Sequence, residues 1–456
     1  MNTRSTSLLV AFGLVLGACS SSASEASTSQ PPPSTEPEAA PAESAPTPEP
    51  SPPAAVAEAP AKPATPAKPA WTPRPEDDIT PHHALENPEA LAYFYDQLAA
   101  LDDGDARVVR VVHLGASMIG MDDLPSILRG KFQTRFGDGG AGLVLLQRYM
   151  TNYIHRWVSL KGKGWEQCYI GYLCKGDGFY GLGGATFWSR GGAKTTIATR
   201  DDALGGEVSH FDVWYAGSKG GGRLKVTVDG QEPVVLETKA DALENRYHAI
   251  DVEKGPHRIT VQPGGGGTAR AFGVVLETDQ GLVWDQFSWL GAFTKRMHAW
   301  NDAHIADQVK HRDPALLVFT FGGNDTRRMA NKKLTGAQYT AEFVKGIEKV
   351  KAGKPEASCL VTAMTDRSRS LDFDVTAVLD DVVEAQRQAA VQSGCAFFDS
   401  FTAMGGKGSL AAWRKKRPSL AAPDRKHLNH AGREVLGGWM YDAIVAGYVA
   451  HRRAAK

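Results

Sequence analysis

Three short segments, far apart in the chain, carry side chains that could together hydrolyse an ester. They are residues 115–117 (Gly-Ala-Ser), 322–325 (Gly-Gly-Asn-Asp) and 424–427 (Asp-Arg-Lys-His). A serine nucleophile needs a base, a group that orients the base, and hydrogen-bond donors for the oxyanion. The segments therefore predict Ser117 as nucleophile, with Asp424 and His427 as the supporting pair.

Each segment also fits an ordinary structural role when it is taken alone. A Gly-x-Ser turn can end in a capping serine, Asn-Asp often caps the next segment, and the basic neighbours of Asp424 favour a surface salt bridge. The spacing of Asp424 and His427 nevertheless lets the carboxylate reach the imidazole and fix its tautomer. The amide of Asn324, after two glycines, can donate to an oxyanion.

The elements around these segments predict an α/β domain. Residues 108–114 (VVRVVHL) are typical of a buried strand, and Ser117 follows at once. Asp122 or Asp123 can cap the next helix, which has Pro125 in its first turn. Further strands are expected at 315–321, 359–363 and 396–399, and further helices at 87–101, 296–310, 339–351, 375–393 and 432–450. This alternation favours a parallel sheet with both faces covered.

The middle of the chain has a different pattern, with short alternating strands and glycine-rich turns but no long helix. The expected strands are 211–215, 223–229, 233–237, 247–252, 258–262 and 271–277. Such a run predicts an antiparallel β-sandwich. We therefore expect a β module of residues 151–280 inserted into an α/β domain formed by residues 76–150 and 281–456.

Taken together and in this order, the three chemical segments resemble blocks of the SGNH/GDSL hydrolase superfamily. Block I carries the serine (Ser117), block III a Gly-x-Asn-Asp sequence (Asn324) and block V an Asp-x-x-His sequence (Asp424, His427). The resemblance covers about residues 90–150 and 280–450. It implies a three-layer, flavodoxin-like fold and a serine hydrolase that needs no cofactor.

Block II of that family supplies a glycine whose N–H completes the oxyanion hole. Residues 283–292 (VWDQFSWLGA) look like this block and point to Gly291, while a Gly-Gly-Ala-Thr sequence makes Gly184 an alternative. We favour Gly291 because block II normally leads into the helix before block III. The resemblance then implies three oxyanion donors, namely the N–H groups of Ser117 and Gly291 and the amide of Asn324.

Two positions depart from the family pattern. Ala116 stands where the family usually has an aspartate, and Leu290 stands where it usually has an asparagine before the block II glycine. The missing aspartate is neither nucleophile, base nor oxyanion donor, but it helps to brace the serine loop. The resemblance therefore implies that Ala116 lowers or alters activity without deleting the chemistry.

The layout, with a β module between blocks I and II, resembles the peptidoglycan O-acetylesterase branch, as do residues 136–142 (FGDGGAG). It implies an esterase that removes O-acetyl groups from a cell-envelope glycan. An O-acetyltransferase would use the same residues, and Ala116 also suits a catalytically impaired glycan-binding lipoprotein. Four tryptophans of the module could stack on sugars, although tryptophan more often packs in a core. They are Trp157, Trp165, Trp188 and Trp214.

The start of the chain predicts export. Residues 1–19 combine Arg4, a short apolar run and a Leu-Gly-Ala-Cys end, which reads as a signal peptide and resembles a lipobox with Cys19 as the lipidated residue. Residues 20–75 are rich in Pro, Ala and Ser and predict a disordered tether. An ordinary signal peptide with an incidental Cys19 is the alternative. We expect a lipid-anchored protein of the cell envelope, with the membrane as a partner.

Cysteine usage and charge narrow the expected function further. Besides Cys19 the chain has four cysteines, an even number that favours two disulfides, Cys168 with Cys174 and Cys359 with Cys395, over free thiols. No pair has the spacing of a metal site. Lysine plus arginine and aspartate plus glutamate number 51 each, so nothing in the charge indicates a nucleic-acid partner.

Overall fold

We describe the fold from a computed structural model of the 456-residue chain. The structure describes residues 71–151, 153–201, 204–371 and 373–455. Contacts divide the chain into two units, Met1–Pro66 and Ala67–Lys456, and all described residues belong to the second. The expected signal peptide, Cys19 and the tether up to residue 70 lie outside the described residues.

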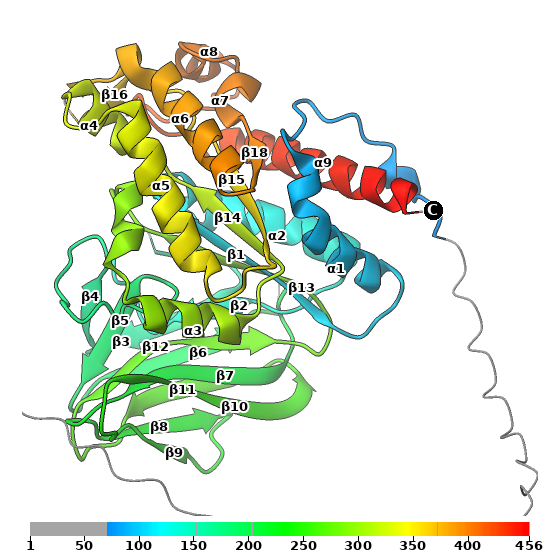
Figure 1. Ribbon diagram of the computed structural model, residues 1–456. Helices are drawn as coiled ribbons and strands as arrows, with labels where there is room; N and C mark the ends of the chain where they lie inside the picture. Colours follow the sequence, from blue (N-terminus) through cyan, green and yellow to red (C-terminus); the bar gives the residue numbers. More distant parts are fainter. Residues whose placement is uncertain (1–70, 152, 202–203, 372, 456) are drawn as a thin grey trace, which may run out of the picture. The chain divides into compact units, whose positions relative to one another are not determined.

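The centre of the folded unit is a five-stranded parallel sheet in the order β13-β1-β14-β15-β18 (Figure 1). Its strands are β1 (Val108–Gly115), β13 (Gly281–Ser288), β14 (Leu316–Thr320), β15 (Ser358–Thr362) and β18 (Ala396–Phe398). Numbered along the chain, the order is 2-1-3-4-5, the arrangement of flavodoxin-like sheets. The predicted fold class is therefore confirmed, and the point where the strand order reverses lies at β1.

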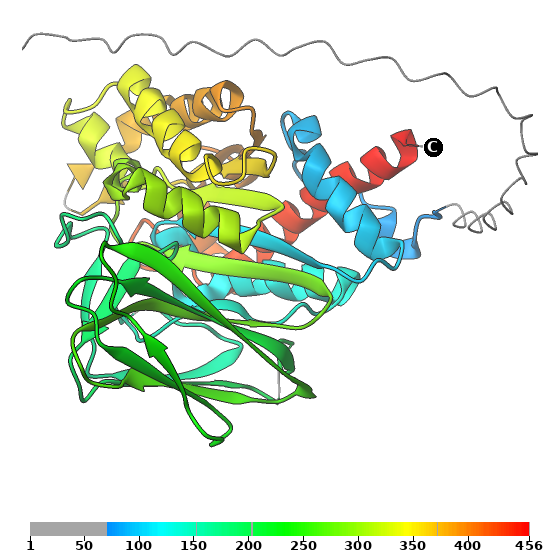
Figure 2. The ribbon, with the colours of Figure 1, turned by 60° about the horizontal axis from the view of Figure 1, so that its bottom comes forward.

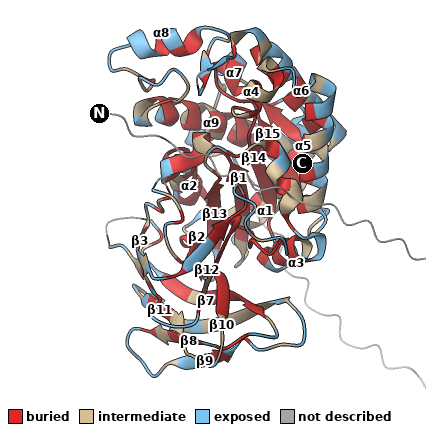
Figure 3. Cartoon of the chain, turned by 90° about the vertical axis from the view of Figure 1, so that its left-hand side faces the viewer, coloured by how far each residue is buried: buried red, intermediate tan, exposed pale blue. Residues whose placement is uncertain are grey.

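Helices cover both faces of this sheet, because alternate residues of a strand point to opposite sides. Val109 and Val111 of β1 belong to one core cluster, while Val112 and Leu114 belong to the other. The first face is covered by α1 (Ala92–Asp102), α2 (Asp123–Phe136) and α9 (His430–Ala454). The second is covered by α3 (Asp302–Arg312), α5 (Gly336–Lys351) and α6 (Leu379–Gln392). The sheet strands are accordingly buried, apart from the partly buried Val108 and Arg110 at the start of β1 (Figure 3).

Short elements follow the carboxyl ends of the parallel strands. They are α4 (Asp325–Ala330), α7 (Ser400–Ala403), α8 (Ser409–Lys415) and the hairpin of β16 (Arg369–Ser370) and β17 (Phe373–Asp374). Ligand sites of doubly wound folds lie outside the carboxyl ends of the strands. These elements therefore surround the place where a site is expected.

The central part of the chain forms two antiparallel sheets that pack together (Figure 2). The first has the order β10-β7-β12-β5-β4, with β2 paired to β12, and the second has the order β3-β6-β11-β8-β9. We call residues 142–277 the β module. Its core is continuous with the core between the parallel sheet and α3, α5 and α6.

The strands of the first sheet of the module are β2 (Gly142–Leu145), β4 (Glu166–Tyr169), β5 (Ala185–Ser189), β7 (Val208–Gly217), β10 (Glu244–Gly255) and β12 (Ala269–Glu277). Those of the second are β3 (Val158–Lys163), β6 (Lys194–Thr199), β8 (Arg223–Val228), β9 (Val234–Glu237) and β11 (Arg258–Pro263). All six strands expected here are present. The sequence pattern missed β2 to β6 and also β13, the edge strand of the parallel sheet.

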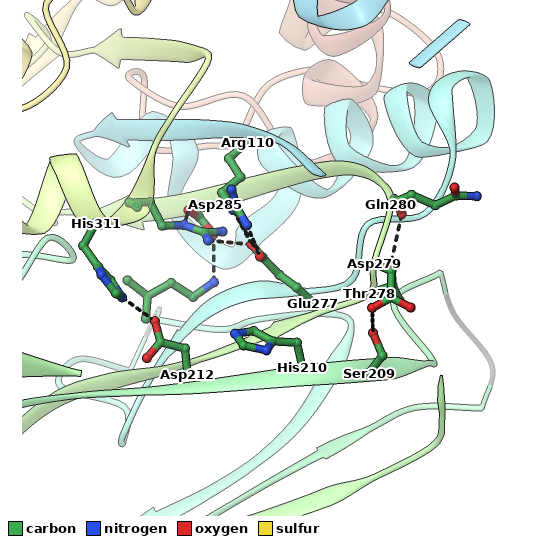
Figure 4. Close-up of polar contacts among 12 residues, drawn as sticks. Arg110, Ser209, His210, Asp212, Glu277, Thr278, Asp279, Gln280, Asp285 and His311 are labelled. Carbon is green, nitrogen blue, oxygen red and sulfur yellow. Dashed lines mark hydrogen bonds and ion pairs between the residues drawn. The ribbon is translucent and has the colours of Figure 1, made fainter. Parts of the chain in front are cut away.

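A buried ion-pair network joins the β module to the parallel sheet (Figure 4). Arg312 of α3 pairs with Asp285 of β13 at 2.6 Å and also with Glu277 of β12. Arg110 of β1 pairs with the same Glu277 at 2.8 Å. Burial alone would raise the pKa of Glu277, but Arg312 and Arg110 hold it at about 2. The network therefore keeps charged groups buried at the contact between the two parts.

Both expected disulfides are present. Cys168 and Cys174 close a small loop after β4, and Cys359 joins Cys395 between the starts of β15 and β18. Parallel strands that are neighbours in a sheet begin side by side, which brings the second pair within bonding reach. Within the described residues, no helix is long and apolar enough to cross a membrane.

The last residues of the expected tether contact the folded unit. Trp71 packs its ring edge-on against Tyr448 of α9 at 6.3 Å, and Arg74 pairs with Asp102 of α1 at 2.6 Å. Tyr448 also donates a hydrogen bond to Asp102. Residues 71–75 thus pack on α1 and α9 in the structure.

Candidate active site

The structure brings together the nucleophile and base candidates from opposite ends of the domain. Ser117 Oγ lies 2.8 Å from His427 Nε2, and His427 Nδ1 lies 2.6 Å from Asp424 Oδ2. One carboxylate, one imidazole and one hydroxyl therefore form a continuous hydrogen-bonded chain. In this arrangement the carboxylate orients the imidazole, and the imidazole can accept the hydroxyl proton.

Ser117 stands at the carboxyl end of β1, where the strand order of the sheet reverses. The turn is fixed by backbone groups on both sides: the Ala116 N–H donates to the Thr320 carbonyl at 3.0 Å, and the Trp289 N–H donates to the Gly115 carbonyl at 2.7 Å. The Ser288 hydroxyl donates to the Ala116 carbonyl. The serine turn is thus braced without a polar side chain at position 116.

The loop before α9 presents the base. Asp424 Oδ1 accepts hydrogen bonds from the backbone N–H groups of Lys426 and His427, while Oδ2 faces the imidazole. Burial raises the pKa of Asp424, but hydrogen bonds from His427 and the backbone outweigh it, so the net shift is downward. The carboxylate is therefore ionised at neutral pH, as an orienting group must be.

His427 is held in its neutral form. Burial lowers the pKa of His427 below its ordinary value of 6.5. The Asp424 carboxylate opposes this shift, and the nearby guanidinium groups of Arg367 and Arg433 reinforce it. A neutral imidazole can accept a proton from the serine hydroxyl at physiological pH.

The structure separates the two candidates for the block II glycine. The Gly184 N–H donates to the Gly181 carbonyl at 3.0 Å, and Gly184 is buried beside Trp289, so this N–H is not free for a substrate. Among the described residues, the N–H groups of Gly291 and Ser117 donate to no protein acceptor. Gly291 has a φ of +70° and open space around its Cα. The geometry therefore favours Gly291.

Asn324 lies beside the same loop. Its Nδ2 atom donates to the Ala292 carbonyl at 2.9 Å, so the amide is fixed next to the residue after Gly291. An amide nitrogen carries two hydrogens, and one of them remains for a further acceptor. Asp325 holds the other side of the loop by accepting from the N–H and the hydroxyl of Thr294, at 3.0 and 2.8 Å.

Asp325 is fully buried, and burial raises its pKa to about 6 despite the hydrogen bonds from Thr294 and the charge of Arg328. One carboxylate oxygen of Asp325 accepts from Thr294, and the other pairs with Arg328, which also pairs with Glu342 of α5. Asp325 therefore positions the loop and does not face the serine–histidine pair.

Several residues that support the site were not anticipated from the sequence. Asp122 occupies the N-cap position of α2, as expected, but its side chain makes no capping hydrogen bond and pairs with Arg129 in a fully buried ion pair. Asp123 pairs with Arg433 of α9, directly behind the His427 loop. Arg129 lies seven residues after Asp122, about two helical turns, and Arg433 lies far along the chain, so the local sequence indicated only capping.

The β module also reaches the site. Tyr169 of β4 and Tyr149 donate hydrogen bonds to the carbonyls of Leu290 and Ser288, on either side of Trp289. No sequence pattern marked these tyrosines. They place the loop that carries Gly291.

The four tryptophans considered as sugar platforms divide into two pairs. Trp165 and Trp214 are buried, and their indole N–H groups donate to Thr195 and Asp212. Trp157 and Trp188 are partly exposed, but a cation covers each ring, Arg129 at 4.9 Å and Lys175 at 3.8 Å. The expectation that these residues serve the core is thus met for the first pair. Among the described residues, no cluster of His, Cys, Asp and Glu could hold a metal ion.

The sequence also matches a known family model. Residues 259–435, from β11 to the first turns of α9, match the GDSL-like lipase/acylhydrolase family. The chain carries a GDSL-like acylhydrolase domain. This domain makes the protein a serine ester hydrolase, as expected from the sequence. No curated protein matches it.

Comparison with solved structures matches the chain to several esterases. A peptidoglycan O-acetylesterase is 18% identical, with a TM-score of 0.66, over 82% of this chain and 99% of that one. An acetyl xylan esterase is 19% identical over 36% of this chain and 80% of its own, with a TM-score of 0.27. A family two carbohydrate esterase from Cellvibrio japonicus is 11% identical over 62% of this chain and 99% of its own, with a TM-score of 0.23. Only the first score supports a shared fold.

Proposed function

We propose that this protein removes O-acetyl groups from a cell-envelope glycan through an acyl-enzyme on Ser117. The observation that carries the proposal is the hydrogen-bonded chain of Ser117, His427 and Asp424. Near it, the N–H groups of Ser117 and Gly291 donate to no acceptor in the part of the chain that the structure describes. Nucleophile, base, orienting group and oxyanion donors thus lie at one edge of the sheet.

In the first half of the reaction, Ser117 Oγ attacks the acetyl carbonyl while His427 Nε2 takes the hydroxyl proton. The negative charge that develops on the carbonyl oxygen is stabilised by the N–H groups of Ser117 and Gly291 and by the amide of Asn324. When the tetrahedral intermediate collapses, His427 returns the proton to the sugar oxygen, which leaves as an alcohol.

In the second half, water replaces the sugar. His427 takes one proton from the water as it attacks the acetyl-serine. When the intermediate collapses, this proton passes to Ser117 Oγ and acetic acid leaves, which then ionises to acetate. Asp424 remains ionised throughout and stabilises the imidazolium that forms in each half. A sugar hydroxyl in place of water would make the protein an O-acetyltransferase.

Two further observations support the proposal. The serine turn is braced by Ser288, Trp289 and Thr320, which compensates for Ala116 and argues against an impaired site. The structural likeness to a peptidoglycan O-acetylesterase covers 82% of this chain, so it includes the β module as well as the sheet. That likeness supports an acetylated glycan as substrate.

The proposal is tested by measuring released acetate. Purified protein should hydrolyse p-nitrophenyl acetate and release acetate from O-acetylated peptidoglycan, and Ser117→Ala should do neither. Adding an unacetylated glycan oligomer tests the transferase alternative, because transfer would yield acetylated oligomer in place of acetate. Hydrolysis that persists in Ser117→Ala would refute the proposed nucleophile.

We also propose that the protein is exported and attached to the cell envelope by lipid on Cys19, since residues 16–19 (Leu-Gly-Ala-Cys) follow a short apolar run. In a detergent partition experiment on cells that express the full chain, wild type should enter the detergent phase and Cys19→Ala should remain in the aqueous phase. Equal partitioning of the two would end this part of the proposal.

A further inference from the structure

A large cavity lies beside the loop that carries Asp424 and His427. Its volume is about 800 Å³, and its walls come from that loop, from the chain after β15 and from α8, at the top of Figure 1. Ala422, Pro423 and Arg425 of the loop line it, and the Ala422 N–H donates to the His427 carbonyl at 2.9 Å. One wall of this cavity is therefore built on the same turn as the proposed base.

The cavity is strongly cationic. Its lining includes five basic side chains and one carboxylate: Arg367, Lys407, Arg414, Lys415 and Arg425, with Asp366. None of the five cations forms an ion pair with a carboxylate of the described residues. Asp366 accepts the N–H of Leu410, and Asp374, whose charge acts on Lys407, accepts from Thr376. The positive charge of the cavity is thus largely uncompensated.

Arg367 is the strongest indication that an anion binds here. It is only 5% exposed, and its Nε atom has no hydrogen-bond partner among the described residues. Its one hydrogen bond to the protein runs from Nη1 to the Gly323 carbonyl at 2.8 Å. The charges of Asp424 and Asp366 act on this guanidinium, but neither carboxylate forms an ion pair with it among the described residues. Burying a guanidinium without such a direct partner is costly, and a bound anion would offset that cost.

We propose that this cavity binds a carboxylate carried by the same glycan that carries the acetyl ester. The inference rests on the proposed function, because it concerns the substrate of the same site. Since the cavity wall and the base share one turn, a single substrate could place its ester at Ser117 and its carboxylate between Arg367 and α8. Arginine suits this role because its planar group binds carboxylates through two hydrogen bonds. The volume leaves room for a substituent larger than a single carboxyl group.

The test compares substrates that differ in charge alone. O-acetylated peptidoglycan fragments are prepared with the stem peptide and with the peptide removed to leave the carboxylate on the sugar, and half of each preparation is amidated at its carboxyl groups. The value of kcat/KM for acetate release is measured for all four. For a carboxylate that reaches the cavity, the kcat/KM of wild type should be about tenfold higher with the carboxylated fragment than with its amidated form. This is the size of effect expected for a hydrogen bond to a charged group.

Variants then assign the preference to the cavity. The double variant Arg414→Gln/Lys415→Gln removes two charges of exposed α8 side chains that line it. The matched control Lys416→Gln/Arg417→Gln removes two charges from the next two residues, which do not line it. The first should abolish most of the preference, chiefly by raising KM for carboxylated fragments, and the control should keep it. A preference seen only with the peptide present assigns the carboxylate to the peptide, and one seen only after its removal assigns it to the sugar. A preference in both preparations shows that the cavity binds either carboxylate.

Other outcomes overturn the inference. The cavity does not bind the carboxylate if wild type releases acetate equally fast from carboxylated and amidated fragments. The same follows if the control variant loses as much preference as the cavity variant. In both cases the esterase proposal still stands. If wild type hydrolyses p-nitrophenyl acetate but none of the four fragments, the proposed glycan substrate fails, and this inference fails with it.

Discussion

The hydroxyl group of Tyr169 donates a hydrogen bond of 2.7 Å to the backbone carbonyl of Leu290. Tyr169 belongs to the β module, and Leu290 immediately precedes Gly291, the proposed oxyanion donor. Tyr149 makes the equivalent contact with the Ser288 carbonyl. The module therefore fixes the position of a catalytic loop, besides any contact that it makes with substrate.

Replacing Tyr169 by phenylalanine tests this link. We expect Tyr169→Phe to lower kcat roughly two- to tenfold, because the loop loses one hydrogen bond worth about 0.5–1.5 kcal/mol. Tyr180→Phe is the control, since it removes a comparable hydroxyl that bonds to the Lys175 carbonyl within the module. Steady-state kinetics on p-nitrophenyl acetate should show the loss for Tyr169 alone. An equal loss in both variants would mean that the effect is general destabilisation.

The serine–histidine–aspartate chain should behave as one unit. Ser117→Ala and His427→Ala should each lower kcat on the order of 10³-fold or more, and the double variant should be little worse than either. Asp424→Asn should cost less, because His427 can still accept a proton. Single-turnover measurements with circular dichroism as a folding control check this. Multiplicative losses in the double variant would show that the two residues act independently.

Replacing Gly291 by alanine should affect turnover, whereas replacing Gly184 by alanine should affect stability. Gly291→Ala places no atom near another, but its φ of +70° costs an alanine about 1–2 kcal/mol and shifts the N–H, so kcat should fall on the order of 10²-fold in folded protein. A Cβ atom at Gly184 would lie 2.4 Å from Trp289 Nε1, so Gly184→Ala should lower the melting temperature. A normal turnover number in Gly291→Ala would exclude that residue from the oxyanion hole.

The pH dependence of kcat/KM should report His427. Only the neutral imidazole accepts the serine proton, so activity is lost as the pH falls through the pKa of His427. Because that pKa lies below 6.5, the acid limb should have its midpoint below pH 6.5. Arg433→Gln removes a positive charge that lowers this pKa and should move the midpoint upward. A midpoint above 6.5 in wild type would contradict the neutral, buried base.

The ion pairs around Arg312 should matter for stability and not for catalysis. Arg312→Met leaves Glu277 and Asp285 buried without their main partner and should cost about 3–5 kcal/mol in urea unfolding at pH 7. Lys254→Met, which removes an exposed ion pair with Glu207, should cost less than about 1 kcal/mol.

The same network predicts acid sensitivity. The pKa of Glu277 is about 2 in the folded protein and ordinarily 4.5, so its contribution to stability is complete above pH 4.5 and is lost between about pH 4.5 and 2. Urea unfolding of Glu277→Gln should therefore show a shallower decline across this range than wild type. If the unfolding free energies of the two proteins decline equally with falling pH, Glu277 is not the cause of the acid sensitivity.

The sequence was informative wherever the chemistry is local or periodic. Residues 108–114 place valines on both faces, which identified β1, and the i, i+3 spacing of Asp424 and His427 identified the base. β13 was missed because Asp285 and Gln286 sit within it, and these polar groups are buried only because Arg312 and the Ile154 carbonyl pair with them. Such distant partners cannot be read from a single segment.

The same reason explains the missed strands of the module. β6 has Ile197 as its one large apolar residue, and its buried Thr195 is satisfied by the Leu146 carbonyl and the Trp165 indole. A strand that pairs along both edges needs little apolar character of its own. Arg367 was likewise invisible, because its surroundings come from segments that meet only in the folded protein.

The position of the β module has a consequence for how the chain folds. β1 and β13 are neighbours in the parallel sheet, although the whole module separates them in sequence. Closing so long an unfolded loop is entropically costly and slow. Within the folded module, β2 pairs with β12, and Asp138 is bridged to Leu282, so the two ends of the insertion meet at its base. Early folding of the module would convert the long connection between β1 and β13 into a short one. Pairing of these two strands in the catalytic sheet would then cost less chain entropy.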